Sequence, residues 1–231
     1  MNEIEGLKEQ LVAAVRMMVA EGLIDFNGHI SARVPGTDHV LIHGRAISRR
    51  VVSAESFTTV DLDGNRLEGA HEPPSETPLH TCTYRARPDV MSVVHLHPHF
   101  STLLGIARQP VVPVFTPGVI FGNGVPVLDD PSTVTTRELG DVVAARLGQG
   151  RALLLRGHGA VVVGESIPNT FVASVYLEEN AKKQYQAALL GDIVSFSAAD
   201  IEGVLPIAWC EKTVKKVWTY CESKARAEGY L

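Results

Sequence analysis

The sequence has few cysteines, no long apolar run and no excess of basic residues. Its three cysteines, Cys82, Cys210 and Cys221, are odd in number and form no CxxC pair, which argues against a disulfide framework or a thiolate zinc site. No stretch approaches the roughly 18 apolar residues that a membrane span requires, and the charged start is unlike a signal peptide. We therefore expect a cytoplasmic protein with reduced thiols and no membrane partner.

Charge and composition narrow the class further. The net charge is -5 at pH 7 and the isoelectric point is about 6.0, so no basic face invites nucleic acid. A hydrophobic fraction of 45% and a charged fraction of 20% are typical of a globular protein, and 231 residues suffice for a domain with its own core. We expect a single domain over residues 1–231 with no nucleic-acid partner.

Hydrophobic periodicity and turn residues predict an alternation of helices and strands. Helices are expected over residues 3–21, 78–87, 98–107, 132–147, 168–190 and 206–227. Strands are expected over residues 29–34, 39–42, 57–62, 66–67, 90–97, 152–155 and 160–163. Thr77 and Ser132 are the expected caps of two of the helices, and Asp63-Gly64 predicts a hairpin. This interleaving, without a low-complexity linker, predicts the fold class α/β with helices on a mixed sheet.

The sharpest chemical feature is the pair His95 and His97. Residues two apart in a strand point to the same face, so both imidazoles can reach one ion while Leu96 packs behind them. Zinc and similar metals bind imidazole nitrogen at about 2 Å. Such a pair also occurs by chance on exposed strands, so taken alone it leaves a metal site and a plain surface strand both open.

Two further residues, His158 and Glu76, indicate a site only in combination with the histidine pair. His158 stands between two glycines directly after an apolar strand, where it is either a ligand or a turn residue. Glu76 follows two prolines at the mouth of a helix, where its carboxylate could bind metal, transfer protons or complement the helix dipole. Spacing alone does not bring Glu76, His95 and His158 together.

Five motifs together resemble the class II aldolase/adducin family over roughly residues 7–205. They are Gly28-His29-Ile30-Ser31-x-Arg33, Pro74-Ser75-Glu76-Thr77-Pro78-x-His80, His95-x-His97, Thr136-Arg137-Glu138-Leu139 and Leu154-Leu155-x-x-His158-Gly159. The resemblance implies a single αβα domain, with a central mixed β-sheet flanked by helices. It also implies one divalent metal ion per subunit, Zn²⁺ or Mn²⁺, bound by His95, His97 and His158.

The same resemblance implies the roles of two residues beside the metal. Glu76 is implied as a further ligand of the empty site and as the acid/base of turnover. His80 follows one helical turn later, where it either tunes Glu76 or packs against the sheet. The family relatives are commonly homotetramers with sites at subunit interfaces, to which Tyr220 or Tyr230 of a neighbour could contribute.

The sequence departs from the sugar-phosphate aldolases of this family where those enzymes cradle a phosphate. His29 replaces their asparagine, Arg45-Ala46 replaces a Thr-Gly pair, and Pro74 replaces the first of two serines, which leaves Ser75. Proline removes a backbone donor, and alanine lacks the freedom of glycine. The pattern is similar to the decarboxylase branch of the family, which acts on hydroxylated aromatic or pyridine carboxylic acids.

We therefore expect a small-molecule carboxylate substrate, bound by His29, Arg45 and Ser75. Arg45 suits a carboxylate through a paired, charge-assisted contact. The nearby Arg49 and Arg50 are interpreted as solvated loop arginines. His29 could donate to the same anion or to a phenolate.

The predicted activity is that of a metal-dependent carbon–carbon lyase. The favoured reaction is non-oxidative decarboxylation of a hydroxylated aromatic or related hydroxy or keto carboxylic acid through a metal-stabilised enolate. The alternative is retro-aldol cleavage, or 4-epimerisation, of a sugar phosphate such as fuculose phosphate, because both reactions leave a similar carbanion. A further alternative is a non-catalytic interaction module like the adducin head.

Overall fold

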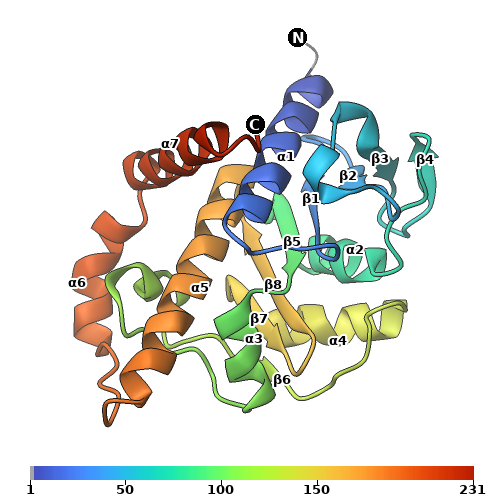
Figure 1. Cartoon of the computed structure of the whole chain (residues 1–231). Helices are drawn as coiled ribbons and strands as arrows, with labels where there is room; N and C mark the ends of the chain where they lie inside the picture. The colour runs from blue at the N-terminus through green and yellow to red at the C-terminus, as the bar shows by residue number, and fades with distance from the viewer. Residues whose placement is uncertain (1–2) are drawn as a thin grey trace.

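An eight-stranded sheet crosses the computed structural model, which describes residues 3–231 (Figure 1). The strands are β1 (His29–Arg33), β2 (Val40–His43), β3 (Phe57–Val60), β4 (Arg66–Glu68), β5 (Ser92–Leu96), β6 (Val127–Leu128), β7 (Ala152–Leu155) and β8 (Gly159–Gly164). Their order in the sheet is β4-β3-β2-β1-β5-β8-β7-β6. Neighbouring strands are antiparallel except β6 and β7, which are parallel. The predicted mixed sheet is therefore confirmed.

Helices cover both faces of this sheet (Figure 1). They are α1 (Glu3–Ala20), α2 (Thr77–Ala86), α3 (His99–Ile106), α4 (Arg137–Leu147), α5 (Ile167–Ala188), α6 (Ala198–Ala208) and α7 (Glu211–Ala227), with short 3₁₀ turns η1 (Arg49–Val51), η2 (Ala54–Ser56) and η3 (Thr116–Phe121). Helices α2 and α4 pack together on one face. Helices α1, α3 and α5 lie on the other face, and α7 packs along α1 and α5. The predicted αβα arrangement is confirmed.

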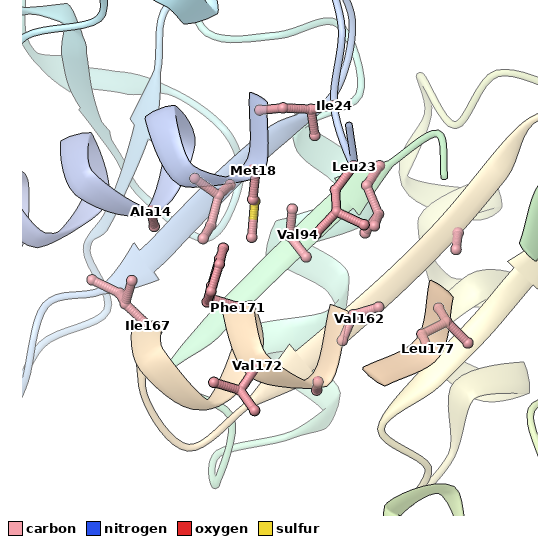
Figure 2. Close-up of a cluster of buried hydrophobic side chains, with 14 of the residues drawn as sticks. Ala14, Met18, Leu23, Ile24, Val94, Val162, Ile167, Phe171, Val172 and Leu177 are labelled. Atoms are coloured by element: carbon pink, nitrogen blue, oxygen red, sulfur yellow. The ribbon is translucent and has the colours of Figure 1, made fainter. Parts of the chain in front are cut away.

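Alternation along the central strands divides the apolar side chains between two cores. Val93 packs in the core under α2 and α4, whereas Val94 packs with Val162 in the core under α1 and α5. Figure 2 shows this second core, where Phe171 of α5 lies beside the sheet. Since side chains in a strand alternate between faces, His95 points to the same face as Val93, toward α2 and α4.

Two of the expected helix starts are wrong. Helix α4 begins at Arg137, because Thr136 is extended and its Oγ1 accepts a hydrogen bond from the N–H of Leu139. Ser132 therefore lies in the preceding loop instead of capping the helix. Thr77 is the first helical residue of α2, not its cap, and its hydroxyl donates to the Pro74 carbonyl.

The C-terminal region also differs from the expectation of one helix over residues 206–227. A capping box formed by Ser197 and Asp200 starts α6 at Ala198, so Pro206 lies inside that helix instead of leading it. A second helix, α7, begins after Cys210. The expected start at Pro206 is therefore wrong, because the side-chain cap decides where the helix begins.

Polar side chains of α5 fasten the segment that follows β5. The Glu178 carboxylate accepts from the N–H groups of Phe100 and Ser101 at the start of α3. The amide of Asn180 accepts from two backbone N–H groups of residues 114–115 and donates to the carbonyl of Val112. The Glu178 contacts fix the chain just beyond His97, because α3 begins two residues after it.

Two further expectations concern the state of the cysteine thiols and the lack of a membrane-spanning segment. Cys82, Cys210 and Cys221 are all free thiols, the first and last of them buried. Over residues 3–231, each helix is too short or too polar to cross a bilayer.

Candidate active site

The ends of three central strands meet at one edge of the sheet. Strand β1 begins at His29, β5 ends next to His95, and β8 begins directly after His158. Because β1 and β8 both run antiparallel to β5, these ends lie together, and His29 is the direct cross-strand partner of His95. Opposite residues of an antiparallel pair share one face of the sheet, so both rings face the layer of α2 and α4.

His95, His97 and His158 lie close enough for one nitrogen of each to bind a single ion. These ring nitrogens all lie within 4.8 Å of one another, and the Nε2 atoms of His95 and His97 are 3.0 Å apart. The turn that carries His158 approaches β5 closely at Gly159, where a Cβ would lie 2.3 Å from the Leu96 carbonyl oxygen. A side chain at this position would therefore block the close contact between the two backbones.

The donor set fits a divalent metal ion. Two nitrogens bound to one tetrahedral ion at about 2 Å lie about 3.3 Å apart, close to the 3.0 Å between the Nε2 atoms of His95 and His97. His95 Nδ1 donates to the Ala160 carbonyl at 3.1 Å, which leaves its Nε2 free as an electron-pair donor. Burial lowers the pKa of His95 and of His97, which favours the neutral ring that binds metal.

Glu76 faces this histidine cluster from the start of α2. Its Oε1 lies 3.5 Å from His158 Nε2, and its Oε2 lies 3.6 Å from His29 Nε2 and 3.7 Å from His95 Nε2. The N–H of Val134 donates to Oε1 at 3.1 Å. Burial opposes ionisation, but the nearby imidazoles of His29, His95 and His158 lower the pKa of Glu76 to about 2. The carboxylate is therefore ionised at neutral pH.

A cavity of about 380 Å³ opens in front of Glu76. It is lined by Phe26, Asn27, Gly28, His29, Arg45, Arg49, Pro74, Ser75, Glu76, His97, Thr133, Gly157 and His158. Candidate metal-ligating side chains, a carboxylate and two guanidinium groups thus share one space.

The two arginines of the cavity differ from the expectation. Arg45 is exposed, whereas Arg49 is only 9% exposed. Nε of Arg49 donates to the carbonyl of Gly28, and Nη1 donates to the carbonyl of Ile47. The interpretation of Arg49 as a solvated loop arginine is wrong, because the loop folds over its side chain and backbone carbonyls take the place of water. Arg50 is exposed, as expected.

Comparison with known proteins decides the family. The description "Class II Aldolase and Adducin N-terminal domain" matches residues 9–185. The chain belongs to the class II aldolase and adducin family. It is 33% identical over 200 residues to a 3,4-dihydroxyphthalate decarboxylase of Arthrobacter keyseri, covering 80% of each chain. It is 30% identical to the enzyme of the same name from Rhodococcus jostii strain RHA1, covering 97% of this chain and 99% of that one.

A solved member of the family gives the structural comparison. The L-fuculose-1-phosphate aldolase of Thermus thermophilus is 30% identical to this chain, and the superposition covers 79% of this chain and 96% of that one with a TM-score of 0.68. The predicted membership of the class II aldolase/adducin family, and the likeness to its decarboxylases, are thus confirmed.

The other predicted site residues of this class II aldolase-family chain lie at different depths. Ser75 is exposed and lines the cavity. His80 is completely buried beneath it, and its ring contacts His29 and Ser31, not Glu76. Tyr220 is 69% exposed on α7.

Tyr230 has a different environment from Tyr220. It packs against the core of its own chain, and the Arg50 guanidinium lies 4.8 Å above its ring. Of the two C-terminal tyrosines, Tyr220 therefore has the more exposed side chain.

Three further residues at the site were not predicted. Val134 supplies a backbone donor to Glu76, and Thr133 lines the cavity, because residues 132–136 form a loop instead of the first turn of α4. Phe26 lines the same cavity and is 82% exposed. The backbone N–H that Val134 donates could not be predicted from the sequence. Threonine is a preferred helix cap, however, and taking Thr136 as the cap of α4 would have placed the preceding residues in a loop.

Proposed function

We propose that this protein is a divalent-metal-dependent lyase that decarboxylates a hydroxylated aromatic acid or a related hydroxy or keto carboxylic acid. The observation that carries this proposal is one cavity lined by Arg45, Arg49 and Glu76 together with two of the three candidate metal ligands, His97 and His158. The names of the two relatives from Arthrobacter keyseri and Rhodococcus jostii support the same reaction class.

The walls of the cavity suit an unphosphorylated carboxylic acid. Arginine binds carboxylates through paired, charge-assisted hydrogen bonds. The positions that cradle phosphate in the aldolases hold His29, Ala46 and Pro74 here, so most of the neutral donors for a phosphate are missing. The exposed ring of Phe26 lines the cavity and offers a face on which an aromatic substrate can stack.

Each residue has a distinct part in this proposal. His95, His97 and His158 would hold the divalent ion, and the bound ion supplies a Lewis acid for the charge that develops as the carbon–carbon bond breaks. Arg45 holds a substrate carboxylate, while Arg49, whose guanidinium donates to backbone carbonyls, adds positive charge to the same cavity. Glu76, whose carboxylate is ionised at neutral pH, takes the proton of a substrate hydroxyl and returns a proton to the carbon that has lost carbon dioxide.

Retro-aldol cleavage of a sugar phosphate is the second candidate. The 30% identity to the Thermus thermophilus L-fuculose-1-phosphate aldolase favours it, and one carboxylate beside three histidines serves either bond cleavage. The two candidates differ in the anion that the cavity must bind, which is a carboxylate in the first and a phosphate in the second.

A parallel screen separates these candidates. Protein reconstituted with Zn²⁺ or with Mn²⁺ is offered 3,4-dihydroxyphthalate and L-fuculose 1-phosphate, with carbon dioxide and aldehyde release measured in both cases. We expect carbon dioxide from the diacid and no aldehyde from the sugar phosphate. Aldehyde release without carbon dioxide would make the protein an aldolase, and no bound metal after dialysis would favour an interaction module.

We also propose a cytoplasmic homo-oligomer, a tetramer by analogy with the family. The exposed Tyr220 on α7 supports a contact with a neighbouring subunit. Sedimentation of the purified protein tests the oligomeric state directly.

A further inference from the structure

Four buried polar side chains form one hydrogen-bonded row beneath the cavity. His29 Nδ1 lies 2.7 Å from His80 Nε2, and His80 Nδ1 lies 2.7 Å from Ser31 Oγ. Ser31 Oγ lies 2.8 Å from the Tyr84 hydroxyl. All four side chains belong to residues that are at most 4% exposed. His29 lines the cavity, so the row leads from the site into the core.

The row follows from the periodicity of two elements. His29 and Ser31 are two residues apart on β1 and share a face of the sheet, while His80 and Tyr84 are four residues apart on α2 and share a face of the helix. The two pairs alternate along the contact between strand and helix. Because both elements are regular, the row is held in place without any loop.

The hydrogens shared by the two imidazoles of this row have two possible arrangements. A neutral imidazole has one donor nitrogen and one acceptor nitrogen. His29 and His80 are 4% and 0% exposed and their facing nitrogens lie 2.7 Å apart, so one ring donates a hydrogen to the other. In the first arrangement this hydrogen is on His80 Nε2, and Ser31 donates to His80 Nδ1. In the second it is on His29 Nδ1, His80 Nδ1 donates to Ser31 Oγ, and the Ser31 hydroxyl turns to the Val93 carbonyl 3.4 Å away.

The cavity end of the row selects the first arrangement. Burial raises the pKa of Tyr84, so its phenol keeps its proton, and this hydroxyl can donate to Ser31 Oγ. Ser31 then donates to His80 Nδ1, and His80 Nε2–H donates to His29 Nδ1. At the cavity end the Glu76 carboxylate can only accept, which suits an N–H on His29 Nε2.

We propose that Tyr84, Ser31 and His80 are positioning residues that hold His29 as its Nε2–H tautomer, so that His29 presents a fixed hydrogen-bond donor to the cavity. The 3.6 Å from His29 Nε2 to Glu76 is long for a hydrogen bond, so this hydrogen is free to meet an anionic substrate oxygen. The reversed tautomer would turn a lone pair toward that oxygen and repel it. The use of this donor in turnover rests on the proposed function, whereas the tautomer itself does not.

Nitrogen-15 NMR of the histidine-labelled, Zn²⁺-loaded protein tests the tautomer directly. The two ring nitrogens have different shifts in the two neutral tautomers, and the signals of His29 and His80 are assigned by their loss in His29→Asn and His80→Gln variants. We expect the Nε2–H form for both residues. An Nδ1–H form of either residue in the unsubstituted protein overturns the proposal, and this measurement needs no substrate.

A serine pair tests whether the row matters for turnover. In Ser31→Ala, His80 Nδ1 loses its donor, so we expect mixed tautomers at His29 and a fall of about 10- to 100-fold in kcat/KM for the diacid. Ser174→Ala is the matched control, because Ser174 is equally buried and its hydroxyl donates to a backbone carbonyl of α5 at 2.8 Å. A loss confined to packing would give both variants the same activity and the same His29 tautomer.

Tyr84→Phe supplies a second variant if Ser31→Ala does not fold. It removes one hydroxyl from the end of the row, and we expect a smaller loss of kcat/KM, because Ser31 can still donate to His80. Equal activity of Tyr84→Phe, Ser31→Ala and Ser174→Ala contradicts the proposal. If the diacid is not a substrate at all, the proposed function fails while the NMR result still decides the tautomer.

Discussion

Acid sensitivity of the fold provides a test of how the histidines are buried. His43 is at the end of β2, is 1% exposed, and has an Nε2 without a hydrogen-bond partner among residues 3–231. Burial, with the charge of Arg49 and the nearby His29, lowers the pKa of His43 from 6.5 to about 3. The folded protein must therefore keep this ring neutral, while the unfolded chain is free to protonate it.

The sign and size of the effect follow from that shift. Between pH 6.5 and pH 3 the unfolded state binds the additional proton, so the contribution of His43 to stability is intact above pH 6.5 and is lost as pH falls toward 3. At about 1.4 kcal/mol per pH unit, lowering the pH from 7 to 5 costs about 2 kcal/mol through this one residue. His43→Gln removes the titrating ring and should reduce the loss by that amount.

Urea unfolding at pH 7 and at pH 5 measures this difference. Each protein is compared with itself at the two pH values, so the constant packing cost of the substitution cancels, and the other buried histidines contribute equally to both proteins. His39→Gln is the control, because His39 is exposed. If His43→Gln loses as much stability as the unsubstituted protein between the two pH values, the buried neutral state of His43 is refuted.

Three further predictions concern the site and its support. Glu76→Gln should keep bound Zn²⁺ but lose about 100-fold or more in kcat. His97→Ala should lose both the bound Zn²⁺ and the activity, and full metal content with normal turnover in this variant contradicts the metal site. Arg45→Ala should raise KM for a carboxylate substrate about tenfold, with the exposed Arg50→Ala as control; an unchanged KM removes Arg45 as the anchor. Asn180→Ala leaves three backbone groups without their partner, so thermal unfolding should show a loss of about 2–4 kcal/mol, and a loss below that of an exposed substitution contradicts this bracing role.

Sequence reasoning predicted the fold well because regular elements carry periodic signals. The alternation of β5 placed His95 and His97 on one side, and hydrophobic periodicity gave most element ends within a few residues. Errors arose where side-chain hydrogen bonds compete with a simpler signal. Thr136 displaced Ser132 as the cap of α4, and the capping box of α6 outweighed Pro206 as a helix start.

The site was harder to predict from the sequence because its residues are distant along the chain. Cross-strand register brings His29 opposite His95, and no local pattern contains that information. Arg49 is buried because its guanidinium donates to the carbonyls of Gly28 and residues 45–47. These contacts cannot be inferred from the composition of a basic loop. Family resemblance supplied His158 and Glu76, whereas the contact of His80 with His29 required the packing of α2 on β1.

The division of the site between strands and loops has an evolutionary consequence. The histidine nitrogens that face one another are carried at the ends of β1, β5 and β8, whose pairing is fixed by the hydrogen-bond ladder at the centre of the sheet. Arg45 and Ser75 stand on connecting segments outside that ladder. Substitutions, insertions or deletions in those segments can therefore exchange one class of substrate for another while the geometry of the ladder is inherited unchanged.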